Sequence, residues 1–191
     1  MPDAAASAEA IVNQAISVLA TGKHDLISTF DAIPAPLYLA DAHGTITYFN
    51  PASIAVAGRT PVVGRDRWCV TWKLHTDDGE ILPHDRCPMA EAIRGKSPVR
   101  GKSAVAERPD GTRRNFVPYP TPLLDRDGTV HCAVNLLIDV TDMKRIEGLR
   151  RQAQRCRHLA QSMTDAKTAN TLRRAAASCE AEAVLLEQRT A

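Results

Sequence analysis

The sequence has few aromatic residues, no long apolar run and no regular cysteine pattern. Phe, Trp and Tyr make up 4% of the 191 residues, so Trp68 and Trp72 stand out by their closeness. No apolar run approaches the roughly 18 residues that a bilayer crossing needs. The start Met1-Pro2-Asp3 also lacks the cationic segment of a secretory signal. We therefore expect a cytoplasmic protein with no membrane contact.

The cysteines and the charge balance argue against a disulfide-stabilised protein and against a nucleic-acid-binding protein. The five cysteines are widely and irregularly spaced, which is not typical of a disulfide framework and fits a reducing compartment. They are Cys69, Cys87, Cys132, Cys156 and Cys179. A net charge of +2 gives no argument for a nucleic-acid partner.

Residues 1–24 predict an N-terminal amphipathic helix that ends near Gly22. Its apolar residues recur at steps of three and four, which indicates a helical stripe. They are Ala5, Ala8, Val12, Ala15 and Leu19. The domain that follows has no obvious need of this stripe for its core, so we expect it to pack against a second copy and form a homodimer.

Residues 25–141 predict an α+β domain with a five-stranded antiparallel sheet and flanking helices. Short strands are expected at 37–40 and 45–50, a helix at 88–95, and three further strands separated by Asp-Gly turns. Prolines in the fourth strand indicate an edge position or a bulge. These are Pro118, Pro120 and Pro122. The last strand alternates without a break, so one of its faces is buried. That face holds Val130, Cys132, Val134, Leu136 and Ile138.

Residues 142–191 predict a helical tail. Two apolar repeats at steps of three and four are separated by a phase break between Met163 and Ala169. The break coincides with Thr164-Asp165, which are good N-cap residues, and favours an antiparallel hairpin of two helices. One long helix with a shifted phase is the alternative.

The order of elements and several motifs resemble the PAS modules of bacterial sensor histidine kinases. Each motif is weak alone, but their order and spacing over about residues 25–145 are fairly specific. They include 36–41 with His43-Gly44, 48–52, 108–112, 120–128 and the closing Asp139-Val140-Thr141-Asp142. The resemblance implies a sensory or dimerising domain that encloses a pocket and sends its signal out through the C-terminal helix.

The resemblance also implies site residues. Four side chains fall on segments that border the PAS cavity, although they could equally fill the core. They are Tyr48, Trp68, Trp72 and Met89. Asp139 and Thr141 take the role of coupling the last strand to the tail, and either could also cap the tail helix.

Alternative chemistries have weaker support. Gly64-Arg65-Asp66-Arg67 departs from the flavin-cysteine segment of light-sensing relatives. A haem or metal sensor would use His84 and Cys87, but zinc-type spacing is missing even with Cys69 and His75 included. His158 could accept phosphate, yet Leu159 stands where an acidic residue would assist, and no nucleotide-binding motif follows.

The tail also carries a run of basic residues, which indicates a solvated face or a docking surface for an acidic signalling partner. The run is Lys144, Arg145, Arg150, Arg151, Arg155 and Arg157. No helix-turn-helix pattern accompanies it, so nucleic acid is not expected. We therefore expect a non-catalytic sensory protein, with a small ligand or a protein partner as its input and no cofactor.

Overall fold

The computed structural model describes residues 2–21 and 26–190. It divides into two compact units, one ending at Asp139 and one beginning at Val140, here called the sheet domain and the tail hairpin. The helix end predicted at residues 22–25 lies outside the described residues. Within the described ranges, no helix is long and apolar enough to cross a membrane.

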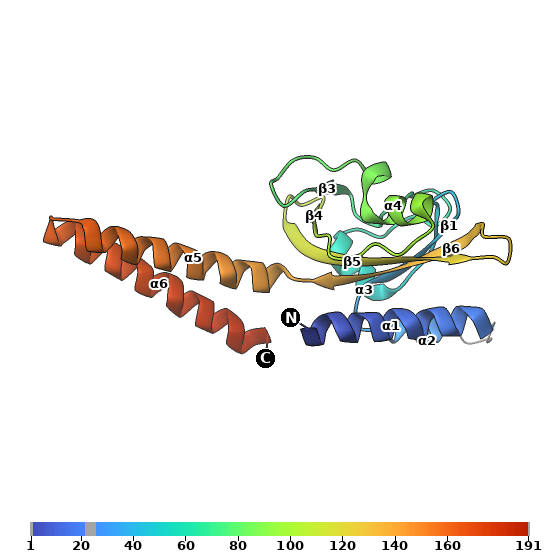
Figure 1. Cartoon of the computed structure of the whole chain (residues 1–191), viewed down its shortest axis with the longest axis horizontal. Coiled ribbons are helices and arrows are strands. Elements are labelled where there is room, and N and C mark those ends of the chain that lie inside the picture. The colour runs from blue at the N-terminus through green and yellow to red at the C-terminus, as the bar shows by residue number, and fades with distance from the viewer. Residues whose placement is uncertain (1, 22–25, 191) are drawn as a thin grey trace. The chain divides into compact units, whose positions relative to one another are not determined.

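The sheet domain is built on one antiparallel sheet of six strands in the order β2-β1-β6-β5-β4-β3 (Figure 1). The prediction of five strands is wrong by one. The additional strand, β3, has only three residues, too few for an alternating pattern to show in the sequence. The strands are β1 Leu37–Asp41, β2 Ile46–Phe49, β3 Lys73–His75, β4 Ala104–Glu107, β5 Arg113–Leu124 and β6 Val130–Asp139.

Short helices cover the inner face of the sheet. Asn50 starts α3, Pro51–Ala57, with its side chain accepting a hydrogen bond from the Ser53 amide at 3.2 Å. The helix α4, Pro88–Gly95, follows the 3-10 turn His84–Arg86 and buries Met89 and Ile93. With apolar side chains of the sheet, these residues make the inner core.

The helix α1, Pro2–Thr21, covers the outer face of the same sheet (Figure 1). Val12 and Ala15 are buried against Val134 and Leu136 of β6, and Phe30 of α2, Leu26–Asp31, joins this outer core. The stripe therefore packs against the chain's own sheet. Our reason for expecting a homodimer is wrong, and the homodimer itself stays a prediction.

An arginine on the loop before β4 fastens α1 to the sheet. The Arg100 guanidinium pairs with both carboxylate oxygens of Glu9 and donates to Oγ1 of Thr121 at 2.8 Å. It also donates to the Pro120 carbonyl at 2.9 Å. The outer core is thus closed by a polar contact at its rim.

Both faces of β6 are buried, and the prolines of β5 lie in the half of that strand that pairs with β6 and not with β4. Val134 and Leu136 face the outer core, while Ala133 and Leu137 face the inner core. β5 lies between β6 and β4, but β4 pairs with it only as far as Phe116, so the edge position expected for the prolines is met only in this half of the strand. There the Val99 amide of the loop before β4 donates to the Pro120 carbonyl at 3.2 Å.

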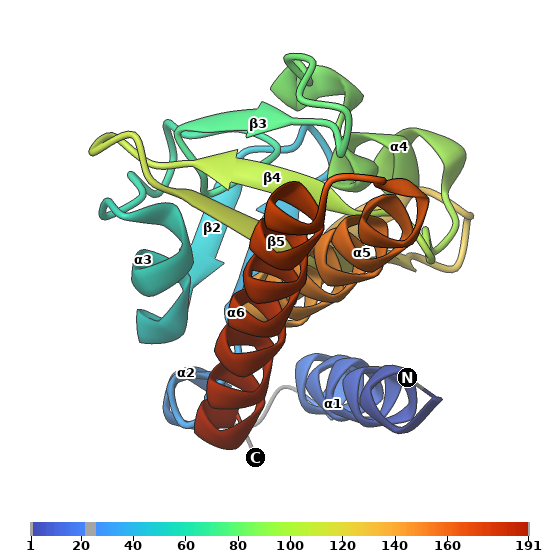
Figure 2. The same cartoon turned by 90° about the vertical axis from the view of Figure 1, so that its left-hand side faces the viewer.

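The tail hairpin consists of α5, Thr141–Ser162, and α6, Ala166–Thr190 (Figure 2). Asp165 caps α6, since its Oδ2 accepts a hydrogen bond from the Thr168 amide at 2.8 Å. The predicted hairpin is therefore confirmed, with the phase break at the turn. Small residues line the seam and let the helices approach closely: Ala153 and Ala160 of α5, and Ala169, Ala176 and Ala183 of α6.

Candidate functional site

A buried polar cluster lies on the inner face of the sheet, between β1 and β6. Tyr38 of β1 and Asn135 of β6 are cross-strand partners, and they are 0% and 2% exposed. Nδ2 of Asn135 donates a hydrogen bond to the Tyr38 hydroxyl at 2.8 Å. That hydroxyl donates to the backbone carbonyl of Trp68 at 3.0 Å. Two strands thereby hold a loop carbonyl inside the core.

One atom of this cluster is unsatisfied. Oδ1 of Asn135 is buried and has no hydrogen-bond partner within the described part of the chain. Exchanging the two amide atoms would not help, because the Tyr38 proton is already donated to Trp68. A buried acceptor without a partner costs about 1–3 kcal/mol. A bound molecule that donates to this oxygen would recover that energy.

Two buried thiols complete the cluster. Cys87 donates from Sγ to the Trp68 carbonyl at 3.8 Å, and Cys69 accepts from Oγ1 of Thr71 at 3.2 Å. Burial, with the nearby Cys69 adding to it, raises the pKa of Cys87 to about 12. Burial also raises the pKa values of Cys69 and, most strongly, Tyr38. The cluster is therefore uncharged near neutral pH and suits hydrogen bonding to a neutral molecule.

The backbone of Trp68 is held in a strained conformation. Its φ of 69° lies in the left-handed region, which a bulky side chain rarely adopts. Such a conformation costs on the order of 1–3 kcal/mol and persists only where the surroundings enforce it. Here it directs the Trp68 carbonyl inward to Tyr38 and Cys87, while the half-buried ring lies beside Gly44.

The structure brings together only two of the four predicted ligand residues. Met89 is fully buried in the inner core, and the Trp68 ring packs against the same core. Trp72 is 44% exposed, with the Lys73 ammonium 4.1 Å from its ring centroid. Tyr48 lies in the outer core. The ligand role of the four stays a prediction.

A β-bulge places Tyr48 on the outer face. Ile46 and Tyr48 pair with the consecutive residues Ala40 and Leu39, so one extra residue of β2 stands between them. As a result, Ile46 faces the inner core and Tyr48 the outer core. The Tyr48 hydroxyl donates to Oδ1 of Asp31 at 2.5 Å, and burial followed by this hydrogen bond raises its pKa.

The residues proposed for haem or metal do not fit such a group. Cys87 points to the Trp68 carbonyl in the core. His84 instead lines an open cleft of about 210 Å³ with Trp72 and Ile81, smaller than the roughly 300 Å³ at which small-molecule sites begin. Burial, followed by the nearby Arg59 charge, lowers the pKa of His84. Among the described residues, no three His, Cys, Asp or Glu side chains could hold one metal ion.

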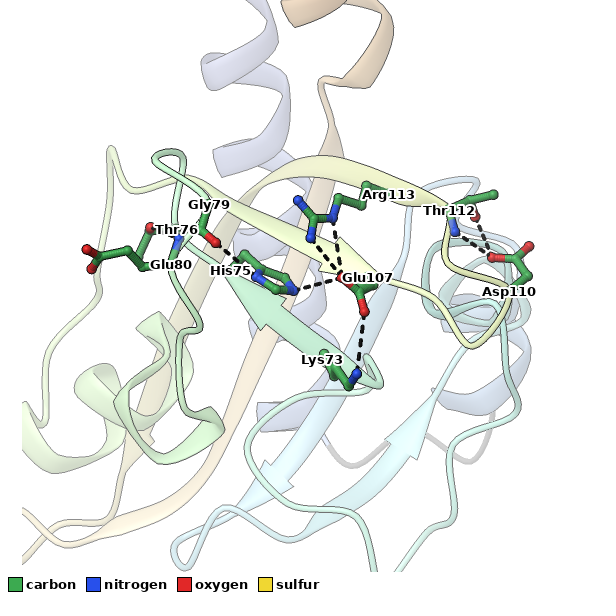
Figure 3. A network of polar contacts seen from close by, with 9 residues as sticks. All are labelled: Lys73, His75, Thr76, Gly79, Glu80, Glu107, Asp110, Thr112 and Arg113. Atoms are coloured by element: carbon green, nitrogen blue, oxygen red, sulfur yellow. Dashed lines mark hydrogen bonds and ion pairs between the residues drawn. The ribbon is translucent and has the colours of Figure 1, made fainter.

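A polar network fixes the additional strand β3 at the sheet edge (Figure 3). Glu107 of β4 accepts from Nη2 of Arg113 at 2.9 Å and from Nζ of Lys73 at 3.5 Å. Nε2 of His75 lies 3.0 Å from the same carboxylate, at an angle too poor for a hydrogen bond. The hydrogen bond from Arg113, followed by the charge of Lys73, lowers the Glu107 pKa. The network explains a strand that the sequence pattern did not reveal.

The two predicted relay residues flank the junction of sheet and tail. Asp139 ends β6, and its Oδ2 lies 4.0 Å from Nη1 of Arg114 beside an open cleft of about 250 Å³. Thr141 begins α5, and Val140 between them is the N-cap residue without a side-chain capping bond. A single residue therefore separates the strand that carries Asn135 from the first tail helix.

The fold is that of the PAS family. A family model described as the PAS fold matches residues 30–145, well over half of the chain, so the chain belongs to that family. No match was found among curated protein sequences.

The solved structures to which the chain is similar are distant in sequence. A LOV protein of Rhodobacter sphaeroides is 15% identical, with 85% of this chain and 94% of that chain covered and a TM-score of 0.47. The PAS domain of the fruit-fly ELK potassium channel is 13% identical over 60% of this chain and 93% of that chain, with a TM-score of 0.46. The LOV domain of a blue-light activated histidine kinase of Erythrobacter litoralis is 22% identical over 57% and 98%, with a TM-score of 0.42.

Proposed function

We propose that this PAS protein is a non-catalytic sensor in which a small neutral ligand on the inner face of the sheet changes the tail hairpin. The observation that carries the proposal is the unpartnered Oδ1 of Asn135, whose Nδ2 is linked through the Tyr38 hydroxyl to the carbonyl of the strained residue Trp68. Asn135 lies on β6, four residues before Asp139. A rearrangement of this strand would reach α5 along the chain through Val140, the one residue between β6 and α5.

The chemistry of the inner face supports a particular kind of ligand. Tyr38, Cys69 and Cys87 are neutral, and their neighbours are apolar. A charged molecule would lose its hydration without gaining an ion pair there. We therefore propose a small, largely apolar molecule that offers one hydrogen-bond donor to Asn135.

The proposal is tested by mass spectrometry of molecules extracted from the purified full chain. Wild type is compared with Asn135→Leu and with Asn170→Leu, which removes an exposed amide from α6. A small molecule retained by wild type and Asn170→Leu but lost from Asn135→Leu supports the proposal. Equal retention by all three, retention by none, or a haem or flavin absorption band contradicts it.

The proposal also covers the signalling partner, the oligomeric state and the location of the protein. The tail hairpin docks a signalling partner, and the protein acts as a homodimer in the cytoplasm. The support for docking is the exposed basic face of α5, where Arg151, Arg155 and His158 lie one turn apart. Light scattering of the purified chain at micromolar concentration tests the homodimer, and a monomer mass would contradict it.

A further inference from the structure

Ion pairs define one side of the tail hairpin. Arg150 pairs with Glu187 at 2.7 Å, and Arg157 pairs with Glu180. Each of these four residues stands four positions after a buried residue of the seam. On α5, Arg150 follows Ile146 and Arg157 follows Ala153; on α6, Glu180 follows Ala176 and Glu187 follows Ala183. Since the pairs join the two helices, the flanks that lie four positions after the seam share one side of the hairpin.

The opposite side is apolar. Residues three positions after the seam lie on the other flank of each helix, because one turn has 3.6 residues. None of the residues three positions after a seam residue is charged. We define the apolar patch as Leu149, Cys156 and Met163 of α5 with Leu172 and Cys179 of α6, together with Leu159, which lies one turn before Met163 on the same side.

The apolar patch is open to solvent. Leu159 is 48% exposed, Met163 is 40% exposed, and the remaining members are half-buried. The ion pair on this side, Arg145 with Glu182 at 2.5 Å, lies toward the beginning of α5. The patch therefore leaves a shallow apolar strip between two helices, the form of surface that receives an amphipathic helix.

The charge of the hairpin favours an acidic occupant. Residues 142–191 hold ten lysine and arginine side chains against six aspartate and glutamate side chains, a net charge of +4. All four glutamates among them are engaged by arginines of α5. Arg155 borders the patch, since it stands one residue before Cys156 and four before Leu159, and it forms no ion pair within residues 26–190. A second copy would bring like charge to this rim, whereas an acidic helix would complement it.

We propose that the apolar patch docks an acidic amphipathic helix of a partner protein, with leucine-type side chains over Leu159 and Met163 and carboxylates toward Arg155. This inference specifies the chemistry of the signalling partner that the tail hairpin is proposed to dock, and it rests on that proposed function. Its test needs no ligand for the inner face, so the two can fail separately.

The test uses a fluorescein-labelled synthetic 18-residue helix with leucines on one face and glutamates on the other, titrated with the full chain. Fluorescence anisotropy follows binding for wild type, Leu159→Gln and Arg155→Glu. Val184→Gln is the matched control, because Val184 is also 48% exposed but stands on the ion-paired side. A scrambled peptide of the same composition and a lysine version of the helix control for charge and amphipathicity.

We expect the acidic helix to bind wild type and Val184→Gln equally. Leu159→Gln and Arg155→Glu should each weaken binding at least about tenfold, a change of roughly 1.4 kcal/mol. Three results would overturn the proposal. The first is that the acidic helix does not bind at about 100 µM protein, which would leave at most a millimolar-range interaction. The second is that it binds but that Leu159→Gln and Arg155→Glu leave the binding unchanged. The third is that wild type forms a dimer that Leu159→Gln dissociates and Val184→Gln does not. The last result would assign the patch to a second copy.

Discussion

Asp139 at the end of β6 forms an ion pair with Arg114 of β5, with 4.0 Å between Oδ2 of Asp139 and Nη1 of Arg114. The pair lies at the last residue of the sheet domain, directly before the tail hairpin. Both side chains are nearly two-fifths exposed, so solvent screens the pair. We expect a double-mutant cycle of Asp139→Ala and Arg114→Ala to give a coupling below about 0.5 kcal/mol. Urea unfolding measures it. A coupling above 1 kcal/mol would show that this pair is a structural anchor.

The inner polar cluster predicts different costs for its two partners. Tyr38→Phe removes the donor to the Trp68 carbonyl and the acceptor for Asn135, so unfolding should become easier by about 1–3 kcal/mol. Asn135→Leu removes an unsatisfied oxygen, and its cost in the ligand-free chain should be smaller than that of Tyr38→Phe. Urea unfolding of both variants checks the order. The reverse order would mean that Asn135 is satisfied without a ligand.

Gly44 should tolerate no side chain. Its φ is +80°, and an added Cβ would lie 2.2 Å from the Trp68 ring. Gly111 has the same φ with open space around it, and so is the matched control. Gly111→Ala should cost only the left-handed conformation, about 1–2 kcal/mol. Gly44→Ala should cost clearly more and shift the tryptophan fluorescence. Equal melting temperatures would contradict the placement of Trp68.

The edge network predicts a pH dependence. The pKa of Glu107 is lowered chiefly by the hydrogen bond from Arg113, with Lys73 and His75 facing the same carboxylate. A lowered folded-state pKa gives a contribution that is complete above the unfolded value near about 4.3 and is lost as the pH falls through the folded value. Glu107→Gln should therefore be less stable than wild type at pH 6 and approach it as the solution is acidified. A difference that does not change with pH would contradict this account.

The seam of the tail hairpin should reject a charge. Ala160 is 3% exposed and faces α6, so Ala160→Glu should destabilise the hairpin by about 1–3 kcal/mol. Ala181→Glu, at an exposed position of α6, is the control and should change little. Circular dichroism during heating measures both. If the two variants melt alike, the seam is exposed.

Much of the fold could be predicted because its signals are local. The alternation of β6, the Asp-Gly turns and the phase break before Asp165 each lie within a few residues. The strand β3 and the packing of α1 could not be predicted in this way. Three residues cannot show a period, and the stripe of α1 indicates only that it is buried, not against what. The sequence predicts that the face of β6 with Val134 is buried, but not that α1 is the element that packs against it.

The candidate site was harder to predict than the fold. Trp68 and Met89 stand on the expected segments, but the bulge in β2 turns Tyr48 to the outer face. Asn135 was overlooked because its neighbours Val134 and Leu136 carried the apolar pattern. An amide in the middle of a strand buried on both faces was the signal available in the sequence. The strain at Trp68 depends on tertiary contacts and leaves no pattern along the chain.

The most direct test of the account is hydrogen exchange, followed by mass spectrometry, of α5 amides after the inner cluster is changed. Wild type is compared with Asn135→Leu, with the double variant Asn135→Leu/Asp139→Ala, and with Thr129→Ala at an exposed turn as the control. We predict that Asn135→Leu changes exchange along β6 and in the first turns of α5, that the added Asp139→Ala removes the α5 change, and that Thr129→Ala causes neither. Identical α5 exchange in wild type and Asn135→Leu would contradict the claim that the inner face of the sheet controls the tail.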